Sequence, residues 1–563
     1  MTKNLTNNQL LMKECIQQEF NDSSFEIEST FFEYFTISEI LKNFNLSDDE
    51  INEGLTGGGN DGGCDGLYVF LNGELVKVDQ VSTLTAPKGS CLNFVIIQAK
   101  NTISFGEDAI MKFKTISENL LPLANSLEDY KTRYNERTLE IFQLFRDSLT
   151  KLIRSQIKIK FSYFCVSLAN EVHPNVLQQA DELKQIVAQA YPASTIEVNF
   201  IGANELMAMY NTTIETNINL SLSDPPIALG EKNDYVALVN LGVYYNFITD
   251  SNGMLRKMLF ESNVRDYQGK NSVNSSIAET LANKSNEDFW WLNNGVTILA
   301  SKAAPITNRE LQLENPKIVN GLQTTNEIFN YFSRDLTLLK EEKRNILIRV
   351  IVPINEESRD NIIFATNNQT SIPKSSLRVT DNIHLQIELY FKNRGLYYDR
   401  RKNYYKNLKK KSKDIISVSF LAQCLISTIM KKPDFARARP STLLTDDSAY
   451  HFLYEENQNL DVYYKLAVLG KRVQLNLTNT VDLSPAEKSD ILFYLLYAVV
   501  AKTLNSNDIT FKKLENFNID DIQEDMINNC KNIIFEKYKE MGGNGRVAKS
   551  KNFINEIDIL LGF

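Results

Sequence analysis

Acidic, amide and basic side chains follow one another near the N-terminus in an order that could hold a divalent cation. The glycine-rich stretch 57–66 carries Asp61 and Asp65, and an apolar run further along the chain ends in Gln98 and Lys100. Carboxylate and amide oxygens are hard ligands that suit Mg²⁺ or Mn²⁺. We therefore predict an Mg²⁺ (or Mn²⁺) site with a lysine at its edge.

Hydrolysis of a phosphodiester bond is the reaction that this set can support. A divalent cation polarises the phosphate and lowers the pKa of a water molecule, and a nearby positive charge stabilises the transition state. We predict that Asp65 and Gln98 bind the metal and that Lys100 orients or deprotonates the attacking water, or stabilises charge. Because Gln98 is neutral, a second carboxylate is needed, and Glu33 in the preceding helical segment completes the set.

Two of these acids have a second interpretation. Glu33 lies on or beside the apolar stripe of its helix, where an acid at the edge of a buried face also reaches water. Asp61 is a candidate ligand of a second metal, but in the sequence N-D-G-G it equally suits a hydrogen bond to its own turn. Both interpretations of each residue are kept.

The predicted elements bring these residues to one edge of a sheet. Asn72-Gly73 is a strong hairpin signal between strands at 67–71 and 74–81, and a third strand at 94–100 makes a three-stranded meander. In that third strand, Gln98 and Lys100 share a face with Phe94 and Ile96. The other predicted elements of this part are a helix over 10–44 broken near 21–24 with a cap at Asp22 or Ser23, helices at 107–121, 135–155 and 175–189, and strands at 157–167 and 195–201.

Length and composition indicate an α/β protein of several domains. The chain has 563 residues, 43% of them hydrophobic, and a net charge of -9. A polar start and the lack of a long apolar run predict a cytoplasmic protein with no membrane partner. Three unpaired histidines and six cysteines without a C-x-x-C motif make structural zinc, disulfides and a Ser-His-Asp triad unexpected.

A segment rich in Ser, Pro and Gly at 220–232 is the predicted linker between the first two domains. We predict an N-terminal domain at 1–219, a mixed α/β domain at 233–416 and a mostly helical part at 417–563. The elements predicted after the linker are strands at 234–246, 295–300, 317–320 and 345–353, and helices at 274–282, 324–332, 356–367, 486–503 and 519–540.

A basic segment stands out from the acidic whole. The residues predicted to contact nucleic acid are Lys392, Arg394, Arg400, Arg401, Lys402, Lys409, Lys410 and Lys411, interleaved with Tyr397, Tyr398, Tyr404 and Tyr405 for base stacking. Lys431, Lys432, Arg437 and Arg439 extend the set. The alternative is a solvated helix face with its tyrosines packed inward.

Short turns in the second half carry amides and hydroxyls. The possible ligand turn comprises Arg265, Asn293, Asn294, Asn320, Gln323 and Thr324, and Asn367, Asn368 and Gln369 are similar. Such groups satisfy base edges, ribose or phosphate, and an arginine can hold a phosphate bidentately. They equally cap helices and join buried turns, so both interpretations stay open.

The stretch DGGCDGLYVF followed by VIIQAK resembles the PD-(D/E)xK nuclease superfamily, nearest to its Mrr-like members, in which Gln commonly replaces an acid. This resemblance implies a restriction-endonuclease-like fold and Mg²⁺-dependent DNA cleavage by a metal-activated water. It implies catalytic roles for Asp65, Gln98, Lys100 and a helix acid. That acid is Glu33 by position, with Glu26 or Glu28 as substitutes.

The second half is similar to the AIPR family of abortive phage-infection proteins. The resemblance rests on NVRDYQGKNSVNSSIAETL from Asn263, FWWLNNGVTILA from Phe289, PKIVNGLQTTNEIF from Pro316 and FATNNQTSIPKSSLRVTDN from Phe364. It implies anti-phage defence in bacteria, with a phage-derived trigger as a candidate partner. Duplex DNA is the expected substrate. A homodimer is expected because two copies of one active site, related by a two-fold axis, can cut both strands. The alternatives are a nucleic-acid- or nucleotide-binding regulator with an inactive nuclease fold, and an RNA-directed nuclease.

Overall fold

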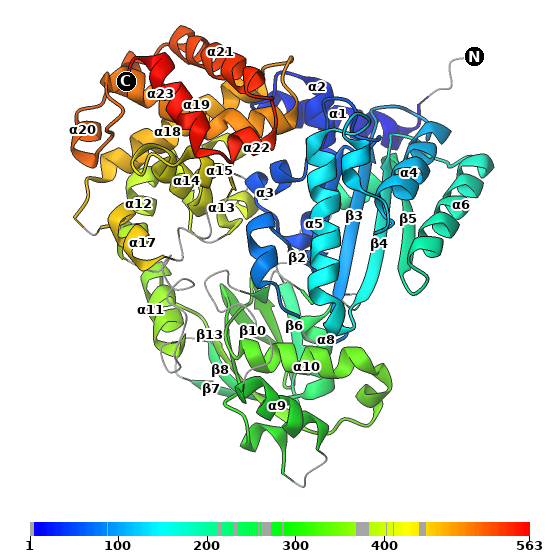
Figure 1. Cartoon of the computed structure of the whole chain (residues 1–563). Helices are drawn as coiled ribbons and strands as arrows, with labels where there is room; N and C mark the ends of the chain where they lie inside the picture. Colours follow the sequence, from blue (N-terminus) through cyan, green and yellow to red (C-terminus); the bar gives the residue numbers. More distant parts are fainter. Residues whose placement is uncertain are drawn as a thin grey trace.

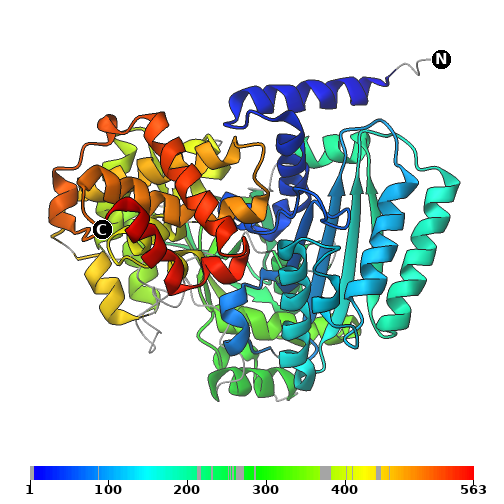
Figure 2. The ribbon, with the colours of Figure 1, turned by 45° about the horizontal axis from the view of Figure 1, so that its top comes forward.

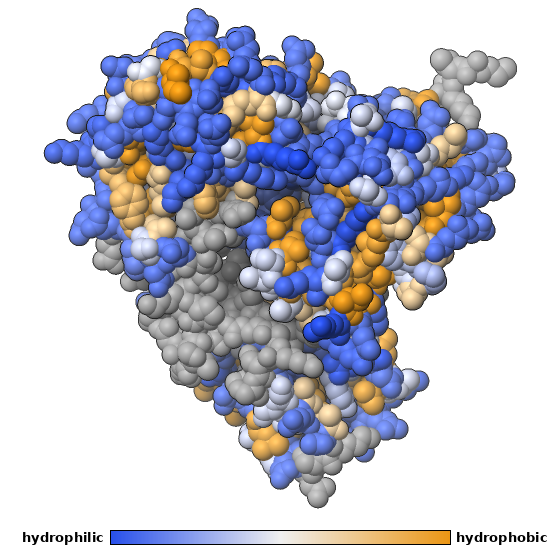
Figure 3. Space-filling model, in the orientation of Figure 1, coloured by the Kyte–Doolittle hydropathy of each residue, from blue (hydrophilic) through white to orange (hydrophobic). Residues whose placement is uncertain are grey.

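The computed structural model describes residues 5–86, 88–211, 217–229, 233–250, 253, 255–256, 259–260, 272–283, 287–367, 382–400, 402–408, 410–438, 446–455 and 457–563. In Figure 1 the N-terminal domain, a middle α/β domain and a helical C-terminal domain lie around a common centre. Among the described helices, none combines the length and the apolar character needed to cross a membrane. The face in Figure 3 is mostly hydrophilic, with separate hydrophobic patches.

A five-stranded mixed sheet organises the N-terminal domain, with the strand order β2-β1-β3-β4-β5. β1 is antiparallel to β2 and β3, whereas β3, β4 and β5 are parallel. The strands are β1 (Gly66–Leu71), β2 (Glu74–Leu75), β3 (Cys91–Ala99), β4 (Lys158–Val166) and β5 (Thr195–Ile201). The helices are α1 (Asn7–Asp22), α2 (Glu28–Ile40), α3 (Asp48–Glu53), α4 (Glu107–Leu120), α5 (Glu136–Leu152), α6 (Pro174–Ala190) and α7 (Ala203–Asn211).

Helices cover both faces of this sheet, and the alternation along β3 explains how. Phe94 and Ile96 pack in a core with α4, α5 and α6, whereas Val95 and Ile97 pack in a second core with α1, α2 and α7. Figure 2 shows α4, α5 and α6 in front of the strands. The predicted face of Gln98 is therefore the α4 and α5 face, and α2 approaches from the other side.

Two details of this domain differ from the sequence expectation. The return strand ends at Leu75, and a 3-10 helix (Val78–Thr83) follows it, so β1 lies between β2 and β3 and the meander prediction is wrong. β1 pairs along six residues with β3, which buries both strands far better than a polar second strand could. The cap of α2 is Ile27 without a side-chain hydrogen bond, so the predicted cap at Asp22 or Ser23 is also wrong.

The middle domain contains a three-stranded sheet, β10-β11-β6, and a five-stranded sheet, β12-β9-β13-β8-β7. The strands are β6 (Asn217–Ser221), β7 (Ile227–Leu229), β8 (Asp234–Asn240), β9 (Val296–Leu299), β10 (Lys302–Thr307), β11 (Glu310–Glu314), β12 (Lys317–Asn320) and β13 (Asn345–Ile351). The helices are α8 (Leu241–Ile248), α9 (Ser272–Ala282), α10 (Leu322–Arg334) and α11 (Glu356–Asn367).

The predicted linker at 220–232 contributes to these sheets. β6 pairs with β11 and β7 pairs with β8, because alternating apolar residues there find open strand edges. The strand predicted over 234–246 ends at Asn240, whose side chain accepts hydrogen bonds from the amides of Gly242 and Val243 and so begins α8. The hairpin of β10 and β11 was not predicted.

The C-terminal domain is a helical bundle around one large core. Its elements are α12 (Asn382–Lys392), β14 (Tyr397–Asp399), α13 (Tyr404–Asn407), β15 (Ile415–Ser417), α14 (Val418–Thr428), α15 (Pro433–Ala438), α17 (Asp447–Leu453), α18 (Leu460–Thr478), α19 (Pro485–Leu504), α20 (Phe511–Glu515), α21 (Glu524–Glu540), α22 (Gly545–Ala548) and α23 (Lys551–Leu561). Ile383, Phe391 and Ile416 pack in this core, so the boundary predicted after residue 416 falls inside it.

The first turn of α3 joins the N-terminal domain to the segment around α13. Glu50 pairs with Lys402 at 2.6 Å, and Asp48 pairs with Lys406 at 2.7 Å. Burial would raise the pKa of either carboxyl, but the lysines and further hydrogen bonds lower both to about 2. These carboxylates therefore stabilise the contact only while they are ionised.

Acid is expected to weaken this contact. The folded pKa values of Asp48 and Glu50 lie below the ordinary values of 3.8 and 4.5, so their contribution is complete above about pH 6 and falls as the pH drops toward 2. We expect Lys406→Met to remove on the order of 1–3 kcal/mol of unfolding free energy at pH 7 and a smaller amount at pH 3. Urea denaturation at the two pH values measures this. The exposed Lys392→Met is the control, and an equal loss at both pH values would refute the assignment.

Candidate active site

Backbone hydrogen bonds fix Asp65 at the point where the glycine-rich turn enters β1. The amide of Asp65 donates to the carbonyl of Ile97 at 2.8 Å, and its own carbonyl accepts from the amide of Thr56 at 3.1 Å. Its Oδ2 atom accepts a hydrogen bond from the amide of Ala99 at 2.7 Å. The carboxylate is thus held at the end of β3 by Ala99, the residue between Gln98 and Lys100.

Asp61 makes the hydrogen bond expected of an Asx turn. Its Oδ1 atom accepts from the amide of Gly63 at 2.7 Å. It also lies near the other acids, since its charge contributes to raising the pKa of both Glu33 and Asp65. The turn interpretation therefore applies, and it leaves the second carboxylate oxygen for a ligand.

Glu33 reaches this turn from α2, on the opposite face of the sheet from Gln98. A Cβ atom on Gly57 would lie 3.6 Å from its Oε2 atom. Burial, and then the charge of Asp61, raises the pKa of Glu33 to about 7. Burial and the charge of Glu33 also raise the pKa of Asp65, against the opposing effects of the Ala99 amide and Lys100. The acids predicted from the sequence therefore converge closely enough to repel one another.

The side chains of Gln98 and Lys100 make no hydrogen bond or ion pair within the described residues. Gln98 is only 3% exposed, and its amide makes no hydrogen bond to any residue in the described ranges. A Cβ atom placed on Gly63 would lie 3.3 Å from the Nε2 atom of Gln98. Lys100 is exposed and forms no ion pair within the described part of the chain. Both groups are free to contact a ligand.

Two residues at this site were missed from the sequence. Lys112 of α4 lies against Gly63, where a Cβ atom would approach its Cδ to 2.5 Å. Asn135, the N-cap of α5, donates from Nδ2 to the carbonyls of Thr56 at 2.8 Å and Gly59 at 3.0 Å. An asparagine before a helical stripe signals an N-cap. The hydrogen bonds from Asn135 to the glycine turn and the position of Lys112 depend on tertiary packing, which local sequence does not reveal.

The donor set fits a hard cation by its chemistry. Glu33 and Asp65 are partly buried carboxylates with raised pKa values, and the buried amide of Gln98 and the side chain of Lys100 flank Ala99, whose backbone holds Asp65. A divalent cation would relieve the repulsion between the acids and engage the amide oxygen. Within the described ranges, no group of three or more His, Cys, Asp and Glu side chains is gathered closely enough to hold a metal ion. Glu33, Asp61 and Asp65 therefore do not form such a group by themselves, and the predicted set adds the amide of Gln98 to them.

The C-terminal domain packs on the outside of the glycine turn. A Cβ atom on Gly58 would lie 2.7 Å from the Cβ of Ser484 and 3.1 Å from the Cδ of Pro485, at the start of α19. Gly58 has a φ of +99°, so this contact requires a residue without a side chain. The turn that carries the candidate ligands is therefore enclosed between α5 and α19.

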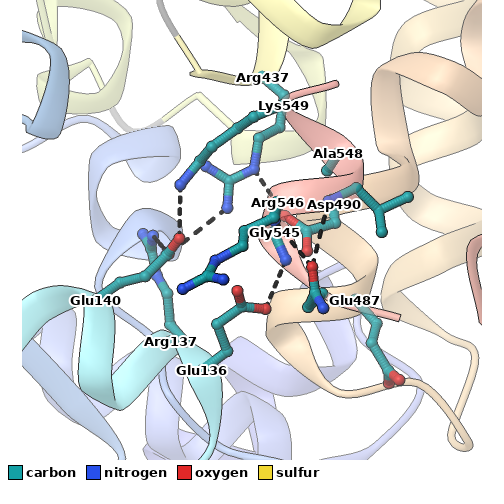
Figure 4. Close-up of polar contacts among 12 residues, drawn as sticks. Glu136, Arg137, Glu140, Arg437, Glu487, Asp490, Gly545, Arg546, Ala548 and Lys549 are labelled. Carbon is teal, nitrogen blue, oxygen red and sulfur yellow. Dashed lines mark hydrogen bonds and ion pairs between the residues drawn. The ribbon is translucent and has the colours of Figure 1, made fainter. Parts of the chain in front are cut away.

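A polar cluster secures α5 against the same domain. Figure 4 shows Arg437 and Lys549 pointing toward Glu140. Arg437 lies 2.7 Å from Asp490 and 3.7 Å from Glu140, and Lys549 lies 2.7 Å from Glu140. Glu136 accepts from the amide of Gly545 at 2.5 Å. We call these residues the α5 clamp. It holds the helix whose N-cap supports the glycine turn.

Part of the described basic segment faces inward or pairs with the N-terminal domain. Arg400 is buried and pairs with Glu388 at 3.0 Å, and Lys402 pairs with Glu50. Lys411 pairs with Asp22 at 3.2 Å. The rings of Tyr398 and Tyr405 are buried, so they cannot stack on bases as predicted. Arg400 in particular cannot reach a nucleic acid, because its guanidinium lies in the core.

The rest of the segment is exposed or lies outside the described residues. Lys392 and Arg394 are exposed, and Arg394 stacks 3.6 Å from the ring centre of Tyr390. Lys410 lies 4.8 Å from the ring centre of Tyr397. Arg401, Lys409 and Arg439 lie outside the described residues.

The structure brings two of the predicted ligand turns together. Asn293 donates from Nδ2 to the hydroxyl of Thr324 at 3.2 Å, and Asn320 donates from Nδ2 to the carbonyl of Thr366 at 2.7 Å. The amide of Gln323 is buried without a hydrogen-bond partner. Asn294 is exposed. Arg265, Asn368 and Gln369 lie outside the described residues.

A family model described as AIPR protein matches residues 260–542, which is just over half of the chain. The match covers parts of the middle domain and of the helical C-terminal domain and leaves out the glycine turn. No curated protein and no solved structure matches the chain.

Proposed function

The chain belongs to the AIPR family, and on that premise we propose that it is a metal-dependent DNA endonuclease that acts in bacterial defence against phage. Family membership suggests a role in abortive infection. The observation that carries the nuclease assignment is the approach of Glu33 from α2 to Asp65, which the amide of Ala99 holds at the end of β3 between Gln98 and Lys100. The order of elements around this site supports the restriction-endonuclease-like fold.

Each residue has a distinct role in this proposal. Bound Mg²⁺ or Mn²⁺ would polarise the scissile phosphate and lower the pKa of the attacking water. Glu33, Asp65 and the amide oxygen of Gln98 hold the cation. Lys100, exposed and unpaired within the described residues, orients the water or stabilises the charge on the phosphate. Lys112, also exposed, offers a contact to the DNA backbone beside the glycine turn.

The experiment that tests the proposal is incubation of the full chain with several substrates in Mg²⁺, Mn²⁺ or EDTA. We expect cleavage of duplex DNA in the presence of either metal and none in EDTA. Single-stranded RNA and modified DNA are included as alternative substrates. RNA cleavage without DNA cleavage would select the RNA-directed nuclease instead.

The neutral amide at 98 favours a second candidate, a regulator that binds nucleic acid or nucleotide through an inactive nuclease fold. In that case Glu33 and Asp65 have no catalytic role. Failure to cleave any substrate with either metal, together with salt-dependent DNA binding, would select this candidate.

Gln98→Glu tests the ligand set directly. A third acid beside Asp65 and Glu33 adds like charge, so we expect it to destabilise the metal-free protein by on the order of 1–3 kcal/mol. Added Mn²⁺ should then raise the melting temperature of the variant more than that of the wild type. Thermal denaturation with and without Mn²⁺ measures both effects. Asn93→Asp, the same change far along β3, is the control and should show no added response to Mn²⁺.

A further inference from the structure

A row of polar side chains crosses the five-stranded sheet of the middle domain. In the strand register Asn320 of β12 lies opposite Thr297 of β9, which lies beside Arg349 of β13. Residues opposite one another in neighbouring strands project to the same face. The adjacent row of Ile298 and Val350 projects to the other face and packs in the domain core. The polar row therefore faces away from that core.

Three side chains in this region have buried polar atoms that the protein leaves unsatisfied. The hydroxyl of Thr297 is fully buried, yet it has no hydrogen-bond partner. The Nε atom of Arg349 is likewise buried without a partner, and its guanidinium forms no ion pair within the described residues. Gln323 buries both atoms of its amide without a partner. Buried polar groups almost always have partners, so such a concentration points to a missing ligand.

Two glycine turns bring the start of α10 to this row. A Cβ atom on Gly321 would lie 2.7 Å from the carbonyl oxygen of Gly295, so a residue with a side chain does not fit at this position without a shift of the backbone. Gly321 is the N-cap of α10 and supplies no side-chain cap to the helix. Gln323 lies in the first turn of α10, three residues after Asn320. The helix start thus adds unshared amide groups and a positive dipole end.

We propose that Arg349, Thr297, Gln323 and the start of α10 bind a nucleotide. A partly buried arginine without a carboxylate partner is suited to an anion, and its planar fork matches a phosphate. The hydroxyl of Thr297 donates to the same group. The amide of Gln323, with a donor and an acceptor, matches the polar edge of a base. This site is separate from the acids of the N-terminal domain and does not depend on the proposed cleavage.

Titration calorimetry on the full chain tests the proposal. The probes are the four ribonucleoside monophosphates, ATP and inorganic phosphate. We expect at least one nucleotide to bind more tightly than phosphate, and Arg349→Gln to weaken that binding about 10-fold or more. The control is Arg309→Gln, an exposed arginine on the β10–β11 hairpin that pairs with Asp224. Its binding should equal that of the wild type.

Thr297→Val provides a second test that separates ligand binding from a structural role. Because the hydroxyl has no partner in the protein, its removal should leave the melting temperature of the ligand-free chain unchanged or higher, while nucleotide binding weakens. No binding by any nucleotide would overturn the proposal, as would equal binding by the wild type and Arg349→Gln. Phosphate binding as tightly as every nucleotide would reduce the site to an anion site and overturn the nucleotide assignment.

Discussion

Replacing Lys100 with alanine is expected to reduce the rate of metal-dependent DNA cleavage by about 100- to 1,000-fold. Lys100 follows the strand that holds Gln98, its charge opposes the rise in the pKa of Asp65, and it makes no ion pair within the described residues. Because the side chain has no ion pair to lose, we expect its removal to affect the proposed reaction rather than the fold. Single-turnover cleavage of a duplex oligonucleotide measures the rate.

Lys158→Ala is the matched control for that experiment. Lys158 is also exposed, and it lies opposite Cys91 at the other end of the same sheet. We expect this variant to cut at the wild-type rate and both variants to melt at the wild-type temperature. Unchanged cleavage by Lys100→Ala would remove this lysine from the proposed site.

Arg437→Ala is expected to lower the unfolding free energy by about 3–5 kcal/mol. Burial would lower the pKa of Arg437, but Asp490 and Glu140 raise it above its ordinary value. Burial alone would raise the pKa of Glu140, yet Arg437 and its other basic neighbours lower it to about 2. Truncating Arg437 leaves Asp490, which is 1% exposed, without its ion pair. Urea denaturation of the full chain measures the loss.

Arg546→Ala is the control in the same interface. Arg546 pairs with Glu128 at 3.3 Å, and both side chains are largely exposed. An exposed pair of this kind contributes at most about 1 kcal/mol. A loss for Arg437→Ala no larger than that for Arg546→Ala would show that the α5 clamp does not stabilise the domain contact.

Local patterns were enough to predict many elements of the N-terminal domain. The alternation in FVIIQAK placed Phe94 and Ile96 on one face of β3, and the hairpin signal at Asn72-Gly73 fell between β1 and β2. The acids and Gln98 lie at the junction of the glycine turn with this sheet. These features depend on neighbours in sequence, which is why they could be predicted.

Contacts between distant residues could not be predicted in this way. The basic segment suggested a nucleic-acid surface because its counter-charges, Asp48 and Glu50, lie more than 350 residues earlier in the chain. The burial of Tyr398 has the same origin, since α12 and β14 pack into the helical core. Charge clustering alone does not distinguish a surface that binds nucleic acid from one that binds another domain.

The same limit applies to the ligand turns of the middle domain. Their amides were recognised from the sequence, but Arg349 was not, because only the register of β9 and β13 places it beside Thr297. Asn293 turned out to hydrogen-bond Thr324, whereas Gln323 has no partner. The structure thus separates the amides that join turns from the one that is free to bind.

Plasmid cleavage by the wild type and Asp65→Ala, side by side in Mg²⁺ and Mn²⁺, is the most direct test of the proposed nuclease. Asp65 is the acid that the backbone positions most firmly, through its hydrogen bond from Ala99. We expect the wild type to convert supercoiled plasmid to nicked or linear DNA and Asp65→Ala to leave it supercoiled. Cleavage by both proteins at the same rate, or by neither, would contradict the assignment.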